Sequence, residues 1–370
     1  MNDQKPPTAL RRGWTTGTCA AGAARAAYQA LLTGTFPDPV PVLLPGGARP
    51  EFALALEERG ADWARAGIVK DAGDDPDVTH GATIVATVRP ASAGVGVVFR
   101  AGPGVGTVTL PGLPLPPGEP AINPVPRAMI RAAVEDVARA HGGAGDVSVE
   151  ISIPGGEKLA QRTMNGRLGI LGGLSILGTT GIVVPYSCSA WIHSIHRGID
   201  VARAAGLDHV AGATGATSEN AVQALHGLSE TALIDMGDFA GGMLKYLRRH
   251  PVPKVTIAGG PAKMSKLAQG LLDLHSGRGA VDLEWLAARL AEAGGDAASV
   301  ERARSANSAM EVFALAQAAG LDLGARVVQA AWLTAARVLA GTDICLEIVI
   351  FDRQGGFIAR APFRRASDTG

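Results

Sequence analysis

The sequence carries no excess of charge and has few aromatic side chains. Its 370 residues include 34 Lys and Arg against 34 Asp and Glu, and aromatic residues make up 4% of the chain. A chain without net charge produces no field that draws it to nucleic acid or to an anionic membrane. So few aromatic rings also offer little for base stacking along a nucleic acid. We therefore expect no nucleic-acid partner.

Cysteine is scarce, and the common nucleophile and phosphate motifs are absent. Cys19, Cys188 and Cys345 lie far apart and form no CxxC pair, which argues against a structural zinc site or a disulfide framework. His193 and His196 could share a metal with Cys188, but no complementary ligand pair stands out. Neither GxSxG nor GxxxxGK[ST] occurs. We predict no metal site, and isolated thiols suit a cytoplasmic protein.

One long segment, residues 168–192, carries no charge. About 20 apolar residues can span a bilayer. However, five glycines interrupt this segment, Pro185 lies within it, and no aromatic or basic belt flanks both ends. We interpret it as buried strands joined by tight turns, and we expect no membrane association.

The length predicts two domains, because domains average roughly 150 residues. We predict an α/β protein (mixed α+β) with an N-terminal mixed-sheet α/β domain over residues 1–145. A helix over residues 18–32 should begin at the threonine hydroxyls before it. A second helix should follow a Pro- and Gly-rich surface segment at residues 103–126. The expected strands cover residues 40–44, 52–56, 82–88 and 94–100.

Residues 146–370 alternate strands and helices, the pattern of a Rossmann-like domain with a mostly parallel sheet. A strand over residues 147–153 opens this domain. Three strand-to-helix units and a C-terminal hairpin follow, separated by further helices. The predicted strands cover residues 147–153, 182–184, 209–212, 232–235, 255–257, 344–351 and 357–361, and the helices cover residues 189–205, 283–293, 308–319 and 325–339.

The turn after the strand at residues 209–212 is the best candidate for cofactor binding. It presents Gly212, Thr214 and Gly215 before a helix that Thr217 or Ser218 could cap, and such a turn exposes backbone N–H groups. Asp235 and Asp238 follow the next strand, where Rossmann folds place the carboxylate that holds a nucleotide ribose. A turn with only two glycines is equally compatible with a plain connection.

Two further segments carry charged side chains. Lys263 and Lys266 lie at another strand-to-helix junction, which suits a carboxylate or phosphate, although two solvated lysines are an equal alternative. Residues 70–81 hold four aspartates but lack the spacing of a calcium loop. A solvated turn is the favoured interpretation from that spacing alone.

Several sequence segments resemble those of the CbiD family, the cobalt-precorrin-5B C1-methyltransferases. The resemblance covers residues 11–275 and is carried by the segments at residues 12–20, 70–81, 118–124 with Arg127, 165–170 and 178–183. Residues 70–81, KDAGDDPDVTHG, match the family phrase letter for letter. The segment at residues 185–191 departs from the family, which carries acidic residues there, and Pro261 is a second departure.

The resemblance implies S-adenosylmethionine-dependent methylation of C1 of cobalt-precorrin-5B, giving cobalt-precorrin-6A. Bound at the turn of Gly212 and at Asp235, S-adenosylmethionine would face a macrocycle held between the domains. His80, flanked by Asp77, is the candidate for proton transfer. The residues expected to contact the macrocycle are Thr15, Thr16, Thr18, Asp71, Asp74, Arg127, Arg167, Lys263 and Lys266.

Two other functions stay open from the sequence. A nicotinamide-dependent oxidoreductase would use the same turn and Asp235 to hold a dinucleotide. A non-catalytic corrinoid-binding protein would hold the macrocycle without transferring a methyl group. In each case the partner is a small cobalt-precorrin, and a homo-oligomer is compatible with the sequence.

Overall fold

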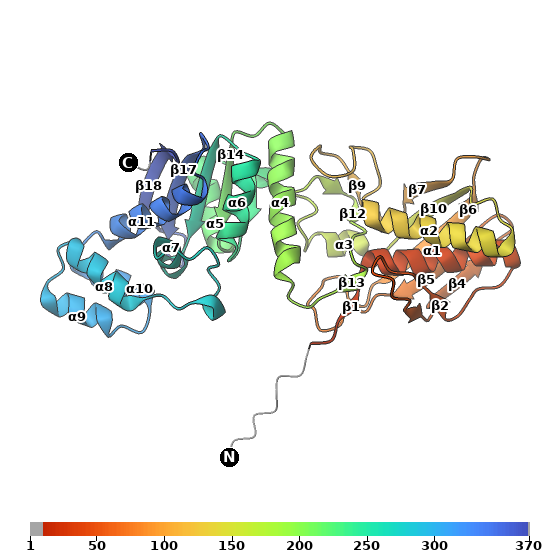
Figure 1. Ribbon diagram of the computed structural model, residues 1–370, viewed down its shortest axis with the longest axis horizontal. Coiled ribbons are helices and arrows are strands. Elements are labelled where there is room, and N and C mark those ends of the chain that lie inside the picture. Colours follow the sequence, from red (N-terminus) through yellow and green to blue (C-terminus); the bar gives the residue numbers. More distant parts are fainter. Residues whose placement is uncertain (1–9, 369–370) are drawn as a thin grey trace, which may run out of the picture. The chain divides into compact units, whose positions relative to one another are not determined.

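The computed structural model describes residues 10–368 and divides into two compact units that join between Cys188 and Ser189. Each unit combines helices with a five-stranded sheet (Figure 1). The chain is therefore a mixed α/β protein, as the sequence predicts. The division falls later in the sequence than the predicted boundary between residues 145 and 146.

The N-terminal sheet has the strand order β4-β5-β6-β10-β7. Its strands are β4 (Leu56–Arg59), β5 (Ala64–Val69), β6 (Thr83–Pro90), β7 (Val97–Ala101) and β10 (Val147–Ser152). β10 pairs antiparallel with β6 and parallel with β7, and its Val147, Val149 and Ile151 are buried. The prediction that this strand opens the C-terminal domain is wrong, because its apolar face completes the N-terminal core.

Two helices, α1 (Thr16–Thr33) and α2 (Pro124–His141), lie side by side in this unit (Figure 1). Thr15 caps α1, since its hydroxyl accepts the Thr18 N–H, and Gly34 ends the helix with a φ of +79°. A left-handed residue at this position favours glycine, which has no Cβ to clash. Alanine dominates the buried surface of α1, so the helix packs closely on β5, β6 and α2.

Short strand pairs complete the N-terminal unit. The prediction that residues 103–126 only wrap the surface is wrong. Val108, Leu115 and Ala121 from this segment form a small core with Ile170, because a backbone kept out of helix by proline and glycine still buries its apolar side chains. The short elements are β1 (Gly13–Trp14), β2 (Val40–Pro41), β3 (Glu51–Phe52), β8 (Gly104–Val105), β9 (Thr107–Val108), α3 (Gly156–Ala160), β11 (Ile170–Leu171), β12 (Gly173–Leu174) and β13 (Ile182–Val183).

The C-terminal sheet has the strand order β15-β14-β16-β17-β18. The first four strands of that order are parallel, and β18 is antiparallel to β17. This confirms the predicted strand-to-helix units and the final hairpin. The strands are β14 (His209–Ala213), β15 (Leu233–Asp235), β16 (Lys254–Gly259), β17 (Cys345–Phe351) and β18 (Phe357–Arg365).

Helices cover both faces of this sheet. α5 packs on β14, β16 and β17, where it encloses a small core, whereas the larger core lies under α4, α6, α7 and α11. None of the helices within residues 10–368 is long and apolar enough to cross a bilayer. The helical elements are α4 (Cys188–Ala204), α5 (Ala216–His226), η1 (Glu230–Ala232), α6 (Ala240–Arg249), α7 (Pro261–Ala268), η2 (Ser276–Arg278), α8 (Leu283–Glu292), α9 (Ala297–Arg304), α10 (Ala309–Ala318) and α11 (Leu323–Val338).

A buried polar network lies where α5 ends over the sheet. The Glu347 side chain on β17 is 0% exposed. Its carboxylate accepts from Thr256 Oγ1 at 2.8 Å and contacts His226 Nε2 at 2.6 Å and the Arg360 guanidinium. His209 Nε2 lies 2.9 Å from Thr256 Oγ1. Burial, followed by the neighbouring His226, lowers the pKa of His209 to about 4.

Candidate functional site

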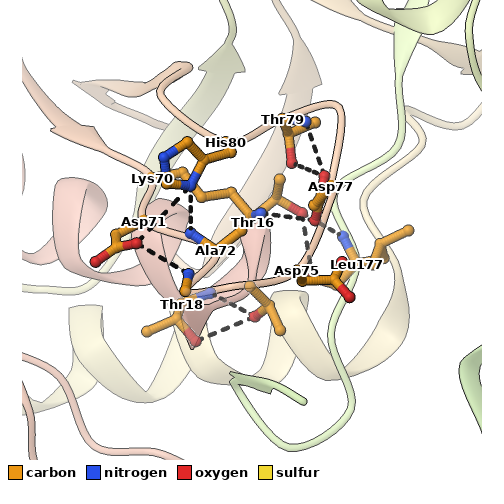
Figure 2. A network of polar contacts seen from close by, with 12 residues as sticks. Thr16, Thr18, Lys70, Asp71, Ala72, Asp75, Asp77, Thr79, His80 and Leu177 are labelled. Atoms are coloured by element: carbon orange, nitrogen blue, oxygen red, sulfur yellow. Dashed lines mark hydrogen bonds and ion pairs between the residues drawn. The ribbon is translucent and has the colours of Figure 1, made fainter. Parts of the chain in front are cut away.

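The aspartate-rich loop at residues 70–81 is organised around a buried ion pair (Figure 2). Lys70 follows β5 with its side chain 1% exposed, and its Nζ lies 2.7 Å from Asp77 Oδ2. Asp77 Oδ1 accepts from Thr79 N at 2.7 Å and from Thr79 Oγ1 at 2.6 Å. Burial alone would raise the pKa of Asp77, but the Lys70 charge and these hydrogen bonds lower it overall. Asp77 is therefore an anchor of the loop.

His80 lies at the open side of this loop, with its side chain 53% exposed. Its Nδ1 accepts the Ala72 N–H at 3.1 Å (Figure 2). In the neutral ring the proton therefore sits on Nε2. This tautomer gives His80 a hydrogen-bond donor at Nε2 for a ligand.

Asp71 and Asp74 are tied to Arg11. The Arg11 guanidinium binds the Asp71 carboxylate through two nitrogens, and the Arg11 N–H donates to Asp74 Oδ2 at 2.6 Å. Hydrogen bonding from Arg11, followed by that from the Gly73 N–H, lowers the pKa of Asp71 to about 2. Both predicted substrate residues are thus already paired with a cation or a backbone donor.

The three threonines at the start of α1 face inward. Thr16 Oγ1 accepts the Leu177 N–H at 2.9 Å, and Thr18 Oγ1 donates to the Gly181 carbonyl at 2.7 Å. Thr15 Oγ1 accepts the Thr18 N–H as the helix cap. All three side chains are buried, so they hold residues 177–181 against the helix and do not present their hydroxyls to solvent.

Arg127 holds the loop before α2. Its Nε donates to the Ile122 carbonyl at 2.8 Å, and a terminal nitrogen donates to Pro120 at 3.0 Å and pairs with Glu119 at 2.8 Å. The guanidinium also lies over the Phe99 ring. Its donors are thus largely satisfied within the chain. Arg167 lies half-buried on the loop between α3 and β11.

In the C-terminal unit, several predicted cofactor residues gather at the carboxyl edge of the parallel strands. Asp235 pairs with Ala213 across β15 and β14, and Thr214 N donates to the Ala258 carbonyl at 3.1 Å. Gly215 is the N-cap of α5, which begins at Ala216. Ser218 is buried in the first turn and its Oγ donates to the Gly215 carbonyl at 2.9 Å, so the prediction that Ser218 caps the helix is wrong. Residues 215–217 are exposed and lie at the helix N-terminus.

Gly212 does not belong to this turn. It lies within β14, and a Cβ added there would come within 2.3 Å of Met243 Sδ. Its small size is therefore needed for packing under α6, and the prediction that it approaches a cofactor does not fit its position. Gly259 at the end of β16 is likewise needed for packing, since a Cβ there would lie 2.7 Å from Met264 Cε and 2.8 Å from Thr214 Oγ1.

Asp238, Lys263 and Lys266 form one cluster. Lys263 Nζ bonds the Asp238 carboxylate, and both lysines donate to the Leu274 carbonyl at 3.1 Å. Burial, followed by the charge of Lys263, lowers the pKa of Lys266. Asp238, predicted to bind the cofactor, thus lies in the same cluster as Lys263 and Lys266, which are predicted to bind the substrate.

Sequence reasoning missed two side chains. Lys70 directly follows the apolar pair Ile68-Val69. A lysine at the end of an apolar strand can have its ammonium group buried, and this position is the signal in the sequence. Trp191 lies on α4 and its Nε1 donates to the Asp235 carbonyl at 3.0 Å. The sequence offers no pattern that would pair these two residues.

Comparison with known proteins gives a consistent match. A family model described as CbiD matches residues 3–185, and one described as CbiD, C-terminal domain, matches residues 273–362. A cobalt-precorrin-5B C(1)-methyltransferase of Bradyrhizobium sp. is 65% identical over 95% of this chain and 93% of its own length. That of Agrobacterium fabrum is 66% identical, with the same coverage. A crystal structure of a cobalamin biosynthesis protein (cbiD) from Archaeoglobus fulgidus is 29% identical, covers 73% of this chain and 83% of its own, and has a TM-score of 0.40.

Proposed function

Because the chain belongs to the CbiD family, we propose that it is a cobalt-precorrin-5B C(1)-methyltransferase. The observation that carries this proposal is an identity of 65% over 95% of the chain to a protein of that name. The reaction transfers a methyl group from the sulfonium of S-adenosylmethionine to C1 of cobalt-precorrin-5B, giving S-adenosylhomocysteine and cobalt-precorrin-6A. A cytoplasmic location is part of the proposal and is supported by three free cysteines.

The C-terminal unit is proposed to be Rossmann-like and to bind the methyl donor. Its strand order places β14 beside β16, and the connection after β14 runs to β15 on one side whereas the connection after β16 runs to β17 on the other. Open α/β sheets bind ligands at the carboxyl ends of strands where the order reverses in this way. Thr214, Gly215 and Ser218 stand at that point, with Asp235 on the neighbouring strand. This placement supports a site in which Asp235 holds the ribose diol.

Methyl transfer to carbon is an in-line displacement that needs alignment more than a covalent nucleophile. The chain's tasks are then to hold the donor, orient the macrocycle and place any proton. The carboxylates of the macrocycle suit a cationic side chain such as Arg167, because cations bind carboxylates by charge-assisted hydrogen bonds. His80 would donate a hydrogen bond from Nε2. Asp77 and Asp71 would act indirectly, by fixing the loop that carries His80, whereas the threonines would hold residues 177–181 against α1.

An anaerobic incubation tests the function directly. The protein is mixed with cobalt-precorrin-5B and S-adenosylmethionine labelled in its methyl group, and the products are separated by mass. We expect one labelled methyl group per macrocycle and an equal amount of S-adenosylhomocysteine. Binding without transfer would favour a corrinoid carrier, and reduction that depends on a nicotinamide would favour an oxidoreductase.

Replacement of Asp235 tests the donor site. Asp235→Ala is expected to weaken binding of S-adenosylhomocysteine about tenfold or more, since hydrogen bonds to a charged group are worth roughly 1.5–3 kcal/mol. Isothermal titration calorimetry measures the affinity, and thermal denaturation verifies that the variant is folded.

The matched control is Asp208→Ala. Asp208 precedes the amino end of β14 and pairs with Lys254 at the surface, so its loss should leave the affinity unchanged. Equal affinities for wild type and Asp235→Ala would refute the placement of the donor at this edge.

A further inference from the structure

Trp191 is an exposed indole held at the carboxyl edge of the C-terminal sheet. It lies in the first turns of α4 with 46% of its surface exposed. Its Nε1 donates to the Asp235 carbonyl at 3.0 Å, and its ring lies 6.3 Å from that of Phe239 at 52°. A Cβ added to Gly237, whose φ is +53°, would lie 3.1 Å from the indole. The indole thus rests on the loop that follows β15.

This position contrasts with that of Trp332 in the same unit. Trp332 is 1% exposed and donates its indole N–H to the Leu346 carbonyl, which is the usual arrangement of a core tryptophan. Trp191 also satisfies its N–H but leaves much of its apolar ring in water. A large aromatic ring that is fixed in orientation and open to solvent is a preformed surface for another flat group.

The backbone of Asp235 links the indole to the proposed donor site. β15 is the edge strand of the sheet, and β14 with its Gly215 turn lies on its inner side. In the proposed site, a ribose held by the Asp235 side chain would carry its methionine portion toward that turn. The base on the same ribose would then lie on the other side, near the loop at residues 235–239 on which the indole rests.

We propose that Trp191 stacks on the adenine ring of S-adenosylmethionine. This inference rests on the proposed function and adds a residue that recognises the base. The indole binds the base through its π-face, while the Nε1 hydrogen bond keeps the ring at a fixed distance from the ribose carboxylate. Trp191 therefore contributes to affinity for the donor and its demethylated product without taking part in proton or methyl transfer.

Two substitutions separate stacking from a purely structural role. Trp191→Ala removes the ring and should weaken binding of S-adenosylhomocysteine about tenfold to a hundredfold, the usual effect of losing an aromatic that stacks on a base. Trp191→Phe keeps a flat ring but loses the hydrogen bond to Asp235, and its affinity should stay within about threefold of wild type. The same penalties should apply to 5′-methylthioadenosine, which shares the base and ribose. Calorimetry measures all three proteins.

Phe357→Ala is the matched control, because Phe357 is an exposed aromatic (58%) on β18, at the opposite edge of the same sheet. Its affinity should equal that of wild type. Intrinsic fluorescence supplies a second readout, since adenine stacked on Trp191 should quench emission in wild type and not in Trp191→Phe.

The outcomes distinguish the inference from the function on which it rests. If wild type binds S-adenosylhomocysteine and Trp191→Ala binds it equally well, stacking is refuted while the methyltransferase proposal stands. Equal losses in Trp191→Phe and Trp191→Ala would show that only the hydrogen bond to Asp235 matters, which also refutes stacking. If wild type binds neither ligand, both proposals fail together.

Discussion

At the scale of single residues, the loop at residues 70–81 is organised around the buried ammonium group of Lys70. Taking a lysine out of water costs several kcal/mol unless a counterion and hydrogen bonds compensate. Lys70 has Asp77 as its partner, and Asp77 in turn holds Thr79. The aspartates that resemble a solvated turn in the sequence therefore have different tasks, and this one balances a charge inside the protein.

Removing that counterion should destabilise the fold. Asp77→Asn preserves the size of the side chain and an oxygen for Thr79 but leaves Lys70 without a negative partner. We expect the free energy of unfolding to fall by about 2–4 kcal/mol, as for other broken buried pairs. Urea denaturation measures the change.

Asp208→Asn provides the comparison at an exposed pair. Its partner Lys254 lies 3.4 Å away with both side chains largely in solvent, so the loss should be at most about 1 kcal/mol. Equal losses in the two variants would argue that the Lys70 pair contributes no more than a surface contact.

The sequence identifies many of these residues but not their roles. Hydroxyls at Thr15 to Thr18 predict a helix cap, which the structure confirms. Their other bonds reach Leu177 and Gly181, more than 160 residues away, and no local pattern encodes such pairs. The role of Arg127 is equally hidden in the sequence. A cation near a loop could bind a ligand, and it could equally bind backbone carbonyls, as Arg127 does.

At the scale of elements, a strand or helix can be recognised from the sequence when its apolar residues recur with a clear period. The units β14–α5, β15–α6 and β16–α7 are found because each joins a short apolar strand to a helix start. β5 is missed because its sequence, ARAGIV, has small residues where a strong strand has branched ones. α9 is missed because AASVERAR has few apolar positions to mark a period.

Close backbone packing in the N-terminal unit leaves no room for a side chain at Gly104. Gly104 in β8 has a φ of +79°, and a Cβ added there would lie 1.9 Å from the Ile153 carbonyl oxygen. Gly104→Ala should therefore lower the free energy of unfolding by at least about 2 kcal/mol more than the left-handed backbone alone explains.

Gly94 isolates that backbone contribution. Its φ is +82°, but a Cβ there meets nothing within 4 Å, so Gly94→Ala should cost only about 1–2 kcal/mol. Urea denaturation of both variants gives the difference. Similar losses would contradict a steric role for the approach of β8 to Ile153.

At the scale of the whole molecule, the sequence predicts two α/β units but misplaces their boundary. A proline-led helix followed by Gly142 to Gly145 is typical of a linker, and the alternating β10 resembles the start of a parallel sheet. β10 instead pairs with β6, more than 50 residues earlier. Only the pairing partner decides to which sheet a strand belongs, and a single sequence does not contain it.

Acid should destabilise the C-terminal unit through His209. Its ordinary pKa of 6.5 is lowered to about 4, first by burial and then by His226, against the opposing charge of Glu347. Lys254 and Asp208 also act on the ring, which packs against Phe363. Between pH 6.5 and 4 the unfolded chain binds a proton that the folded chain excludes, so stability falls as pH decreases through this window. Above pH 6.5 this histidine contributes no pH dependence.

The expected loss is about 1–2 kcal/mol, after allowing for solvent around the half-buried ring. Urea midpoints measured from pH 7 to pH 4 should fall more steeply for wild type than for His209→Gln. His141→Gln, which alters an exposed histidine at the end of α2, should retain the wild-type slope. An unchanged slope in His209→Gln would contradict this assignment.

The central place of β10 also bears on how the protein is made. β7 pairs only with β10 within the five-stranded sheet, and β6 has β10 on one side. During translation both strands leave the ribosome well before the strand that joins them. The nascent chain must therefore carry an unpaired β7 and one open edge of β6 until residue 152 has emerged, an interval in which chaperone binding or misassociation between neighbouring nascent chains competes with folding.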